Sequence, residues 1–150
     1  MLTETVTETK DYLYQGCFEI EGDNFSKAGI ASTSIKSGLK KIGISGDLIK
    51  RAAIVSYESE VNIVCHAIKG VISVKVSPNT IEIEAVDEGP GIADIELAMQ
   101  EGYSTADHHI REMGFGAGMG LPNMKKYSDN LNISSEVGKG TIIKATISIL

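Results

Sequence analysis

The segment DEGPGI, from Asp87 to Ile92, places a carboxylate beside two glycines, Gly89 and Gly91. It follows directly after an alternating apolar run, so these residues come where a strand is expected to end. Glycine adopts positive φ values and lets backbone groups approach a ligand closely. We interpret the segment either as part of a binding pocket that presents a hydrogen-bond acceptor or as an ordinary Asp-Gly turn.

A second glycine series, Gly114, Gly116, Gly118 and Gly120, stands before a predicted helix over residues 119–128. The free N–H groups at a helix N-terminus form an anion site, and the positive end of the helix dipole favours negative charge there. A phosphate chain would suit such a site. The series is not a P-loop, because no Gly-Lys-Ser/Thr follows it. A loop that is flexible and nothing more is the alternative.

Glu58 and Asn62 are four residues apart on a long predicted helix and therefore share one helical face. The amide oxygen of an asparagine can ligate Mg²⁺, and the carboxylate of a glutamate can accept a proton. The pair is therefore suited to one site that does both, with an exposed helix face as the alternative. Glu60, between them, is expected to be a solvated charge.

Hydrophobic periodicity predicts the elements that must position these residues. The predicted strands are 12–20, 71–76, 81–86, 131–135 and 141–150, and the predicted helices are 25–42, 47–69, 94–101 and 119–128. Strands 71–76 and 81–86 are expected to pair as a hairpin, and so are strands 131–135 and 141–150. Gly70 is expected to end the second helix. This order predicts an α+β fold: a two-layer sandwich with a mixed, mainly antiparallel sheet and helices on one face.

The composition fits one domain. The chain has 150 residues, of which 42% are hydrophobic, and we assign residues 1–11 to a flexible N-terminus and 12–150 to the domain. No stretch approaches the roughly 18 to 20 continuous apolar residues of a membrane span. The polar start does not resemble a signal peptide, so a cytoplasmic protein is expected. The net charge of −6 argues against non-specific binding to nucleic acid or to anionic lipid.

Four motifs, in order and spacing, resemble the sequence boxes of the GHKL ATP-binding family, which gyrase, Hsp90, MutL and histidine kinases share. They are Glu58-x3-Asn62, Asp87-x-Gly89-x-Gly91, Gly116-x-Gly118-x-Gly120-Leu121 and Gly138-x-Gly140-Thr141. The stretches DEGPGIADIELAMQEGYST and GAGMGLPNMKKYSDNLNISSEVGKGT are especially similar to the bacterial anti-sigma factor serine kinases and the related stressosome switch kinases. The resemblance covers about residues 12–149 and implies the Bergerat ATP-binding fold.

The resemblance implies that ATP and Mg²⁺ bind across these motifs. Asp87 would accept a hydrogen bond from the adenine amino group, with Thr141 in support. Asn62 would hold Mg²⁺ against the phosphates, and Glu58 would be the general base that takes the proton from a substrate serine. The implied nucleotide-binding residues are Asn62, Asp87, Gly89, Gly91, Gly116, Gly118, Gly120, Leu121 and Thr141.

These roles imply a serine/threonine protein kinase of a bacterial partner-switching system, which phosphorylates a serine on a small antagonist protein. A sigma factor is a further partner in such systems. One alternative is a non-catalytic, ATP-dependent module that sequesters a sigma factor or another regulator. A second is a detached catalytic domain that works with a histidine-containing partner. A homodimer that pairs near the first strand is compatible with the resemblance, and the oligomeric state is left open.

Ile63 and His66, which follow Asn62 on the predicted helix, also bear on the resemblance. Ile63 stands where the family usually has alanine, so the packing under the nucleotide is expected to differ. His66 matches a histidine often seen in the anti-sigma kinases, and we favour a packing or hydrogen-bonding role over a catalytic one.

The insert at residues 106–113 lengthens the loop that the resemblance makes a mobile ATP lid. It contains His108 and His109, which we expect to be solvated rather than metal ligands, because no third ligand stands at a helical spacing. Arg111 is a candidate contact of the γ-phosphate.

Overall fold

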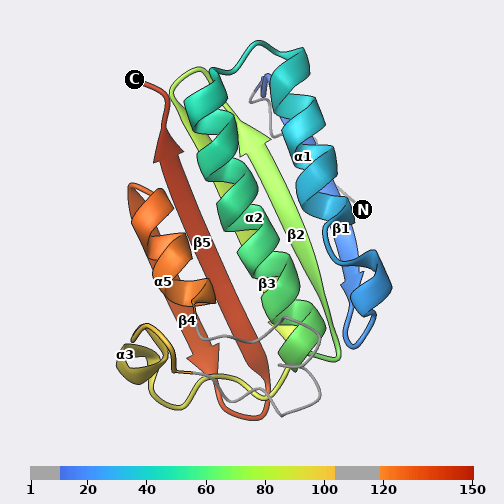
Figure 1. Ribbon diagram of the computed structural model, residues 1–150, viewed down its shortest axis with the longest axis vertical. Coiled ribbons are helices and arrows are strands. Elements are labelled where there is room, and N and C mark those ends of the chain that lie inside the picture. The colour runs from blue at the N-terminus through green and yellow to red at the C-terminus, as the bar shows by residue number, and fades with distance from the viewer. Residues whose placement is uncertain (1–10, 104–118) are drawn as a thin grey trace.

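The computed structural model describes residues 11–103 and 119–150. These residues form one sheet with helices along one of its faces (Figure 1). The predicted flexible N-terminus lies outside the described residues apart from Asp11, so its flexibility and the domain boundary stay predictions.

The sheet has five strands, in the order β1-β2-β3-β5-β4. All four pairings between these strands are antiparallel. The strands are β1 (Tyr14–Glu21), β2 (Lys69–Val76), β3 (Thr80–Glu88), β4 (Asn130–Glu136) and β5 (Gly140–Ser148). Both predicted hairpins, β2–β3 and β4–β5, are confirmed. Because β5 pairs with β3, the chain that leaves β3 lies next to the turn between β4 and β5.

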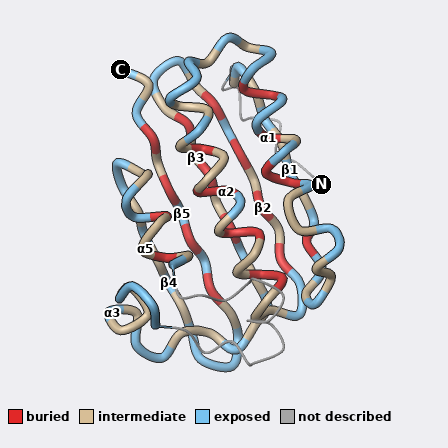
Figure 2. The backbone as a smooth tube through the Cα atoms, in the orientation of Figure 1, coloured by how far each residue is buried: buried red, intermediate tan, exposed pale blue. Residues whose placement is uncertain are grey.

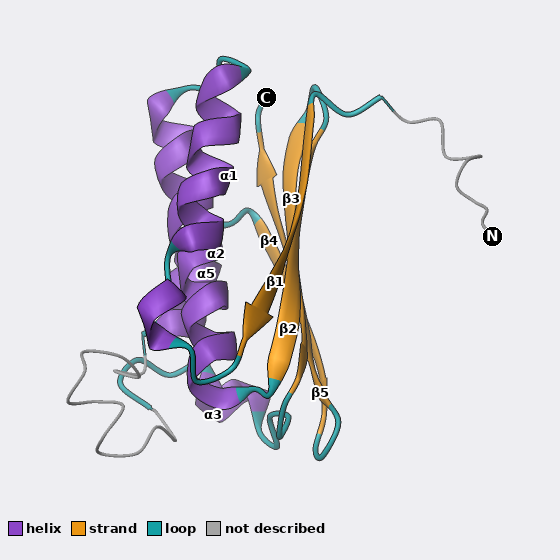
Figure 3. Cartoon of the chain, turned by 90° about the vertical axis from the view of Figure 1, so that its right-hand side faces the viewer, coloured by secondary structure: helices purple, strands orange, loops and turns teal. Residues whose placement is uncertain are grey.

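The helices form the second layer, and the side view in Figure 3 shows them all on one side of the sheet. The three longer ones are α1 (Ile30–Lys41), α2 (Gly46–His66) and α5 (Gly120–Tyr127), and the short ones are η2 (Phe25–Lys27) and α3 (Ile95–Ala98). Helix α2 lies between α1 and α5 in Figure 1 and packs against both. The predicted α+β fold class is therefore confirmed.

The core lies between the two layers, and Figure 2 shows buried positions on both the strands and the helices. Strand β3 alternates buried and partly exposed residues, so its isoleucines at 81 and 83 point at the helices. From the helical layer, Val55 of α2 and Leu39 of α1 are completely buried. The period-two and period-3.6 patterns of the sequence thus meet at one apolar interface.

Helices α1 and α3 each have one boundary that differs from the prediction by several residues. Helix α1 starts at Ile30 instead of residue 25, because Gly29 has a φ of +105° and interrupts the helical backbone after the short η2 turn. Helix α3 ends at Ala98 instead of residue 101, although Asp94 does begin it: the Asp94 carboxylate accepts a hydrogen bond from the Leu97 N–H at 3.0 Å.

The prediction that Gly70 ends the second helix is wrong. Helix α2 ends at His66, and Gly70 lies within β2, opposite Ile20 on one side and Asp87 on the other. A Cβ at Gly70 would lie 2.8 Å from the Ile63 side chain and 2.9 Å from the Val86 carbonyl oxygen, so a close approach selects glycine here. Ile68, which falls within the predicted helix 47–69, is instead 76% exposed between α2 and β2.

The prediction that Glu60 is a solvated charge is also wrong, because its side chain is only 1% exposed. Its two carboxylate oxygens accept hydrogen bonds from the backbone N–H groups of Ala31 at 3.0 Å and Ser32 at 3.2 Å. These N–H groups belong to the first turn of α1, where Gly29 offers no side chain to cap them. A glutamate of α2 therefore caps the N-terminus of α1.

We predict that Glu60→Ala lowers the free energy of unfolding by about 2–4 kcal/mol, because it leaves two buried N–H groups without an acceptor. Urea denaturation measures the effect. Glu96→Ala, at an exposed position of α3, is the matched control and should change the stability by less than about 0.5 kcal/mol. Equal stability of the two variants would contradict the capping role.

Candidate functional site

Asp87 lies near the end of β3, beside Thr141 at the start of β5. The register that pairs Val86 with Ile142 brings them together, and the Thr141 N–H donates to Asp87 Oδ1 at 3.1 Å. Burial raises the pKa of the half-buried Asp87 carboxyl, and the Thr141 hydrogen bond partly offsets that increase. Among the described residues no hydrogen bond reaches Oδ2, so this oxygen can accept one from a ligand.

Ser135, on the neighbouring strand β4, supports the same corner. Its Oγ accepts a hydrogen bond from the Ile92 N–H at 2.7 Å and lies 2.9 Å from Thr141 Oγ1. It also donates to the Gly140 carbonyl at 3.1 Å. Sequence reasoning missed Ser135, since an isolated serine in a strand carries no signal. This hydroxyl ties the loop after β3 to the hairpin that carries Thr141.

Gly91 and Gly140, one from each motif, are required by direct contact between the two loops. Gly91 has a φ of +77° and Gly140 a φ of +150°, values that disfavour other residues. A Cβ at Gly91 would clash with the Glu136 carbonyl oxygen, and one at Gly140 with the Asp87 carbonyl oxygen. The Gly138 N–H also donates to the Pro90 carbonyl at 2.8 Å. The two loops are therefore packed backbone against backbone.

Glu58 is on α2 and faces the first turn of α5. Its Oε2 accepts a hydrogen bond from Asn123 Nδ2 at 2.9 Å, and its Oε1 lies 3.6 Å from the place a Cβ would take at Gly120. Leu121 is buried and anchors the start of α5 in the core. The structure thus places the predicted base beside the helix N-terminus that was predicted to bind an anion. The other two glycines, Gly116 and Gly118, lie outside the described residues.

The C-terminal half of α2 runs from Glu58 to the loop that carries Asp87. Asn62 is half-buried one turn beyond Glu58, and Ala67 follows the last residue of the helix. Ala67 touches the Asp87 loop, because a Cβ at Gly89 would lie 3.1 Å from its Cα. From Glu58 to Ala67 the axis of α2 spans about 13 Å at 1.5 Å per residue. One helix thus reaches from the α5 side of the site to the Asp87 side.

Asn62 suits a metal ion that binds together with a phosphate ligand. The described residues contain no cluster of three or more His, Cys, Asp or Glu residues that could hold a metal ion. Mg²⁺, however, is commonly bound through one or two protein oxygens together with substrate phosphates. The single amide oxygen of Asn62 suits that arrangement and not a metal cage made of protein alone.

Ile63 and His66 both lie near the C-terminal end of α2. Ile63 is buried, and its side chain packs over Gly70 in the core. His66 is half-buried in the last turn of α2, and burial lowers its pKa. The role of His66 stays a prediction. The predicted lid, with His108, His109 and Arg111, lies outside the described residues.

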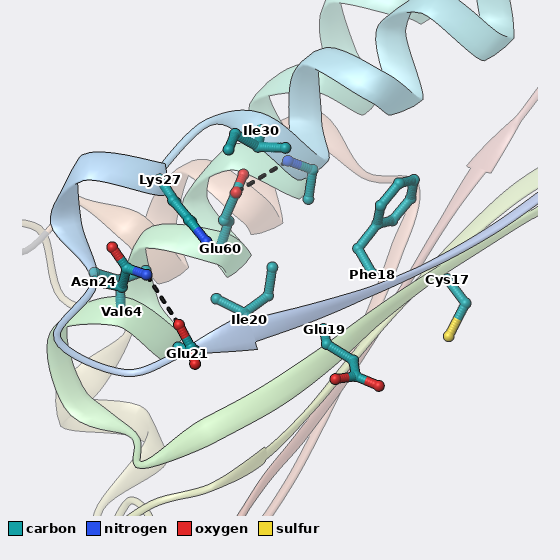
Figure 4. Close-up of a pocket in the computed structure, with 11 residues that line it drawn as sticks. Cys17, Phe18, Glu19, Ile20, Glu21, Asn24, Lys27, Ile30, Glu60 and Val64 are labelled. Carbon is teal, nitrogen blue, oxygen red and sulfur yellow. Dashed lines mark hydrogen bonds between the residues drawn. The ribbon is translucent and has the colours of Figure 1, made fainter.

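A groove on the other side of α2 is not part of this site (Figure 4). It has a volume of about 430 Å³ and lies between β1, η2, α1 and α2. Its buried acidic group is Glu60, and Figure 4 shows this side chain turned to the backbone of α1. Both Glu60 oxygens already accept hydrogen bonds there.

The fold and site define an ATP-binding domain of the GHKL class, and sequence comparison agrees. Residues 50–149 match the family described as histidine kinase-, DNA gyrase B-, and HSP90-like ATPase. The chain belongs to this family. Among the described residues, none of the helices combines the length and the apolar character needed to cross a membrane.

Three relatives show which kinds of GHKL protein the chain is similar to. The chain is 39% identical over 94 residues to the anti-sigma F factor of Thermoanaerobacter sp. (strain X514), covering 59% of this chain and 62% of that protein. It is 36% identical over 88 residues to the serine/threonine-protein kinase RsbT of Bacillus subtilis (strain 168), covering 56% and 60%. The anti-sigma F factor of Clostridium acetobutylicum is 31% identical over 130 residues, 82% of each chain. The first of these matches thus spans less than two thirds of its relative's length.

Two glycines of one turn offer a test of the contact between the loops. Gly138→Ala and Gly140→Ala both place a side chain at positive φ, but the space around Gly138 is open. We expect Gly140→Ala to cost about 1–3 kcal/mol more of the free energy of unfolding, because its Cβ collides with the β3 backbone. Thermal or urea denaturation measures the difference, and equal costs would contradict the contact.

Proposed function

We propose that the chain is a Mg-ATP-dependent serine/threonine protein kinase of a bacterial partner-switching system. The observation that carries the proposal is the Glu58 carboxylate, which is held by Asn123 beside the N-terminus of α5. Proteins related to the chain carry the names anti-sigma F factor and serine/threonine-protein kinase. The substrate is a serine hydroxyl on an antagonist protein, a sigma factor is the further partner, and the cytoplasm is the proposed location.

The adenine end of the nucleotide lies at Asp87. Because Oδ1 already accepts the Thr141 N–H, Oδ2 is the oxygen available for the adenine amino group. Gly89 and Gly91 themselves add no side chain next to this acceptor. Fixing the carboxylate in advance from a neighbouring strand limits the conformational entropy that binding must remove.

The phosphate end lies at the first turn of α5. Its free N–H groups and helix dipole favour an anion, with Gly120 and Leu121 at the start of the helix. Gly116 and Gly118 precede them in the sequence and are proposed to bind the same phosphates. Asn62 would hold Mg²⁺ against the phosphates, and this ion would supply charge neutralisation for the transferred group.

Phosphoryl transfer then requires one proton acceptor. The serine oxygen forms a bond to the γ-phosphorus as the bond from that phosphorus to the β,γ-bridging oxygen breaks, which releases ADP. Glu58 takes the hydroxyl proton. Positioning and electrostatic stabilisation supply most of the rate enhancement in such reactions, and a positioned base adds about 10²–10⁴-fold.

A second candidate function is a non-catalytic module that binds a sigma factor in an ATP-dependent way. The relatives named anti-sigma F factor favour it. It shares the nucleotide site with the kinase and differs only in having no phosphoryl transfer. A detached histidine-kinase domain is the third candidate, for which acid-labile phosphate on a partner is the diagnostic. The homodimer stays a prediction for either function.

We predict that Asp87→Asn weakens Mg-ATP binding about 10–100-fold in a calorimetric titration. The amide oxygen can still accept the Thr141 N–H, but the amide nitrogen is then a donor that faces the adenine amino donor, which costs about 1.5–3 kcal/mol. Because burial raises the pKa of Asp87, the charged carboxylate lowers the stability of the folded protein. This cost is fully present at pH values above the pKa of Asp87 in the folded state. The neutral variant should therefore be no less stable at pH 7.

The control for this titration is Asp47→Asn, a change at an exposed position in the first turn of α2. This turn is at the opposite end of the helix from Ala67, which touches the Asp87 loop. It should bind Mg-ATP like the wild type. Undiminished binding by Asp87→Asn would remove Asp87 from the adenine site.

We predict that Glu58→Gln reduces phosphoryl transfer about 10²–10⁴-fold and leaves Mg-ATP binding at least as tight, because the amide keeps the shape but cannot take a proton. The assay follows the γ-phosphoryl of labelled ATP onto serine in an extract of the source cell, and mass spectrometry identifies the acceptor protein. Glu96→Gln is the exposed control. Tight ATP binding by the wild type with no serine labelling would favour the non-catalytic module.

A further inference from the structure

Asn123 touches the side chain to which the proposed chemistry assigns the proton. Its Nδ2 donates to Glu58 Oε2 at 2.9 Å, in a partly buried contact between two helices that joins residues 65 positions apart. The Asn123 backbone is fixed as well, because its N–H donates to the Met119 carbonyl at 2.9 Å. No motif of the sequence analysis included Asn123.

The helix that carries Asn123 is attached firmly to α2. Met124, the next residue, is completely buried, and Ser59 Oγ lies 3.6 Å from its sulfur. At the other end of α5, Arg51 Nε donates to the Tyr127 carbonyl at 3.1 Å, and the Arg51 guanidinium pairs with Asp129 at 3.2 Å. The position of Asn123 relative to Glu58 is therefore set by core packing and by a second set of contacts at the C-terminal end of α5, about one turn away.

We propose that Asn123 is a positioning residue for the base: it holds Glu58 through Oε2 so that Oε1 faces Gly120 and the phosphate end of the site. This inference rests on the proposed kinase function. A carboxylate on a long side chain samples many rotamers, and a misplacement of about 1 Å can cost on the order of 100-fold in rate. A hydrogen bond from a fixed helix removes that freedom.

The chemistry of the amide suits this role. An amide N–H donates a hydrogen bond but does not take up a proton near neutral pH, so Asn123 does not compete with Glu58 for the serine proton. A lysine or arginine here would form an ion pair with the carboxylate. Within residues 11–103 and 119–150, Glu58 has no ion-pair partner, and the side chain that bonds its carboxylate there is the neutral Asn123.

A double-mutant cycle on single-turnover transfer tests the proposal, with γ-labelled ATP and the acceptor protein identified by serine labelling. We expect Asn123→Ala to lower the transfer rate about 10–100-fold with an unchanged dissociation constant for Mg-ATP. Asn123→Asp keeps the shape of the side chain but replaces the donor by a like charge, and we expect at least the same loss. In a Glu58→Gln background, Asn123→Ala should change the residual rate by less than about twofold.

Rates are expressed per ATP-binding site, so a misfolded fraction does not contribute. The matched control is Asn132→Ala, an exposed position on β4, which should transfer at the wild-type rate. Wild-type transfer by Asn123→Ala or Asn123→Asp, or independent effects that multiply in the double variant, would overturn the positioning role alone. Absence of transfer by the wild type would overturn the kinase function and this inference with it.

Discussion

The structure depends on two glutamates of one helix that bind two different helices. Residues two apart on a helix point to different sides, and α2 uses this geometry: Glu60 caps the N-terminus of α1, while Glu58 accepts a hydrogen bond from α5. Because all helices lie on one face of the sheet, α2 is the only one in the described residues that touches both other long helices. Its rotation about its own axis therefore determines whether Glu58 faces the site.

Much of this arrangement follows from the sequence. The alternating runs around Ser77–Thr80 and the 138–140 turn predict both hairpins, and the glycine motifs predict where loops approach one another. Partners across space could not be predicted in this way. Glu60 and Asn123 are each bound by a residue on another helix, and neither local periodicity nor charge pattern encodes such a pair. The end of α2 was misplaced because Gly70 was read as a helix stop, whereas close packing in β2 requires it.

The corner around Asp87, where adenine is proposed to bind, is built by strand register and not by a specialised loop. Asp87 and Thr141 are 54 positions apart in sequence, but antiparallel pairing of β3 and β5 places them side by side. Ser135 on β4 then joins the loop after β3 to the same hairpin. Since β5 holds one oxygen of this carboxylate and β4 supports Thr141 beside it, the orientation of Asp87 is a property of the sheet. Gly91 and Gly140 are needed where the loop and the turn touch.

Electrostatics explains why amides accompany the carboxylates in this site. The chain carries a net charge of −6, and Glu58 and Asp87 both add negative charge where a polyanionic nucleotide is proposed to bind. Two further acids at positions 62 and 123 would repel the phosphates at short range, where screening by salt is weakest. With the proposed roles, asparagine at both positions would supply an oxygen ligand and an N–H donor without that charge. The binding energy at the phosphate end would then come from backbone N–H groups and the metal, and the single carboxylate beside them would take the proton.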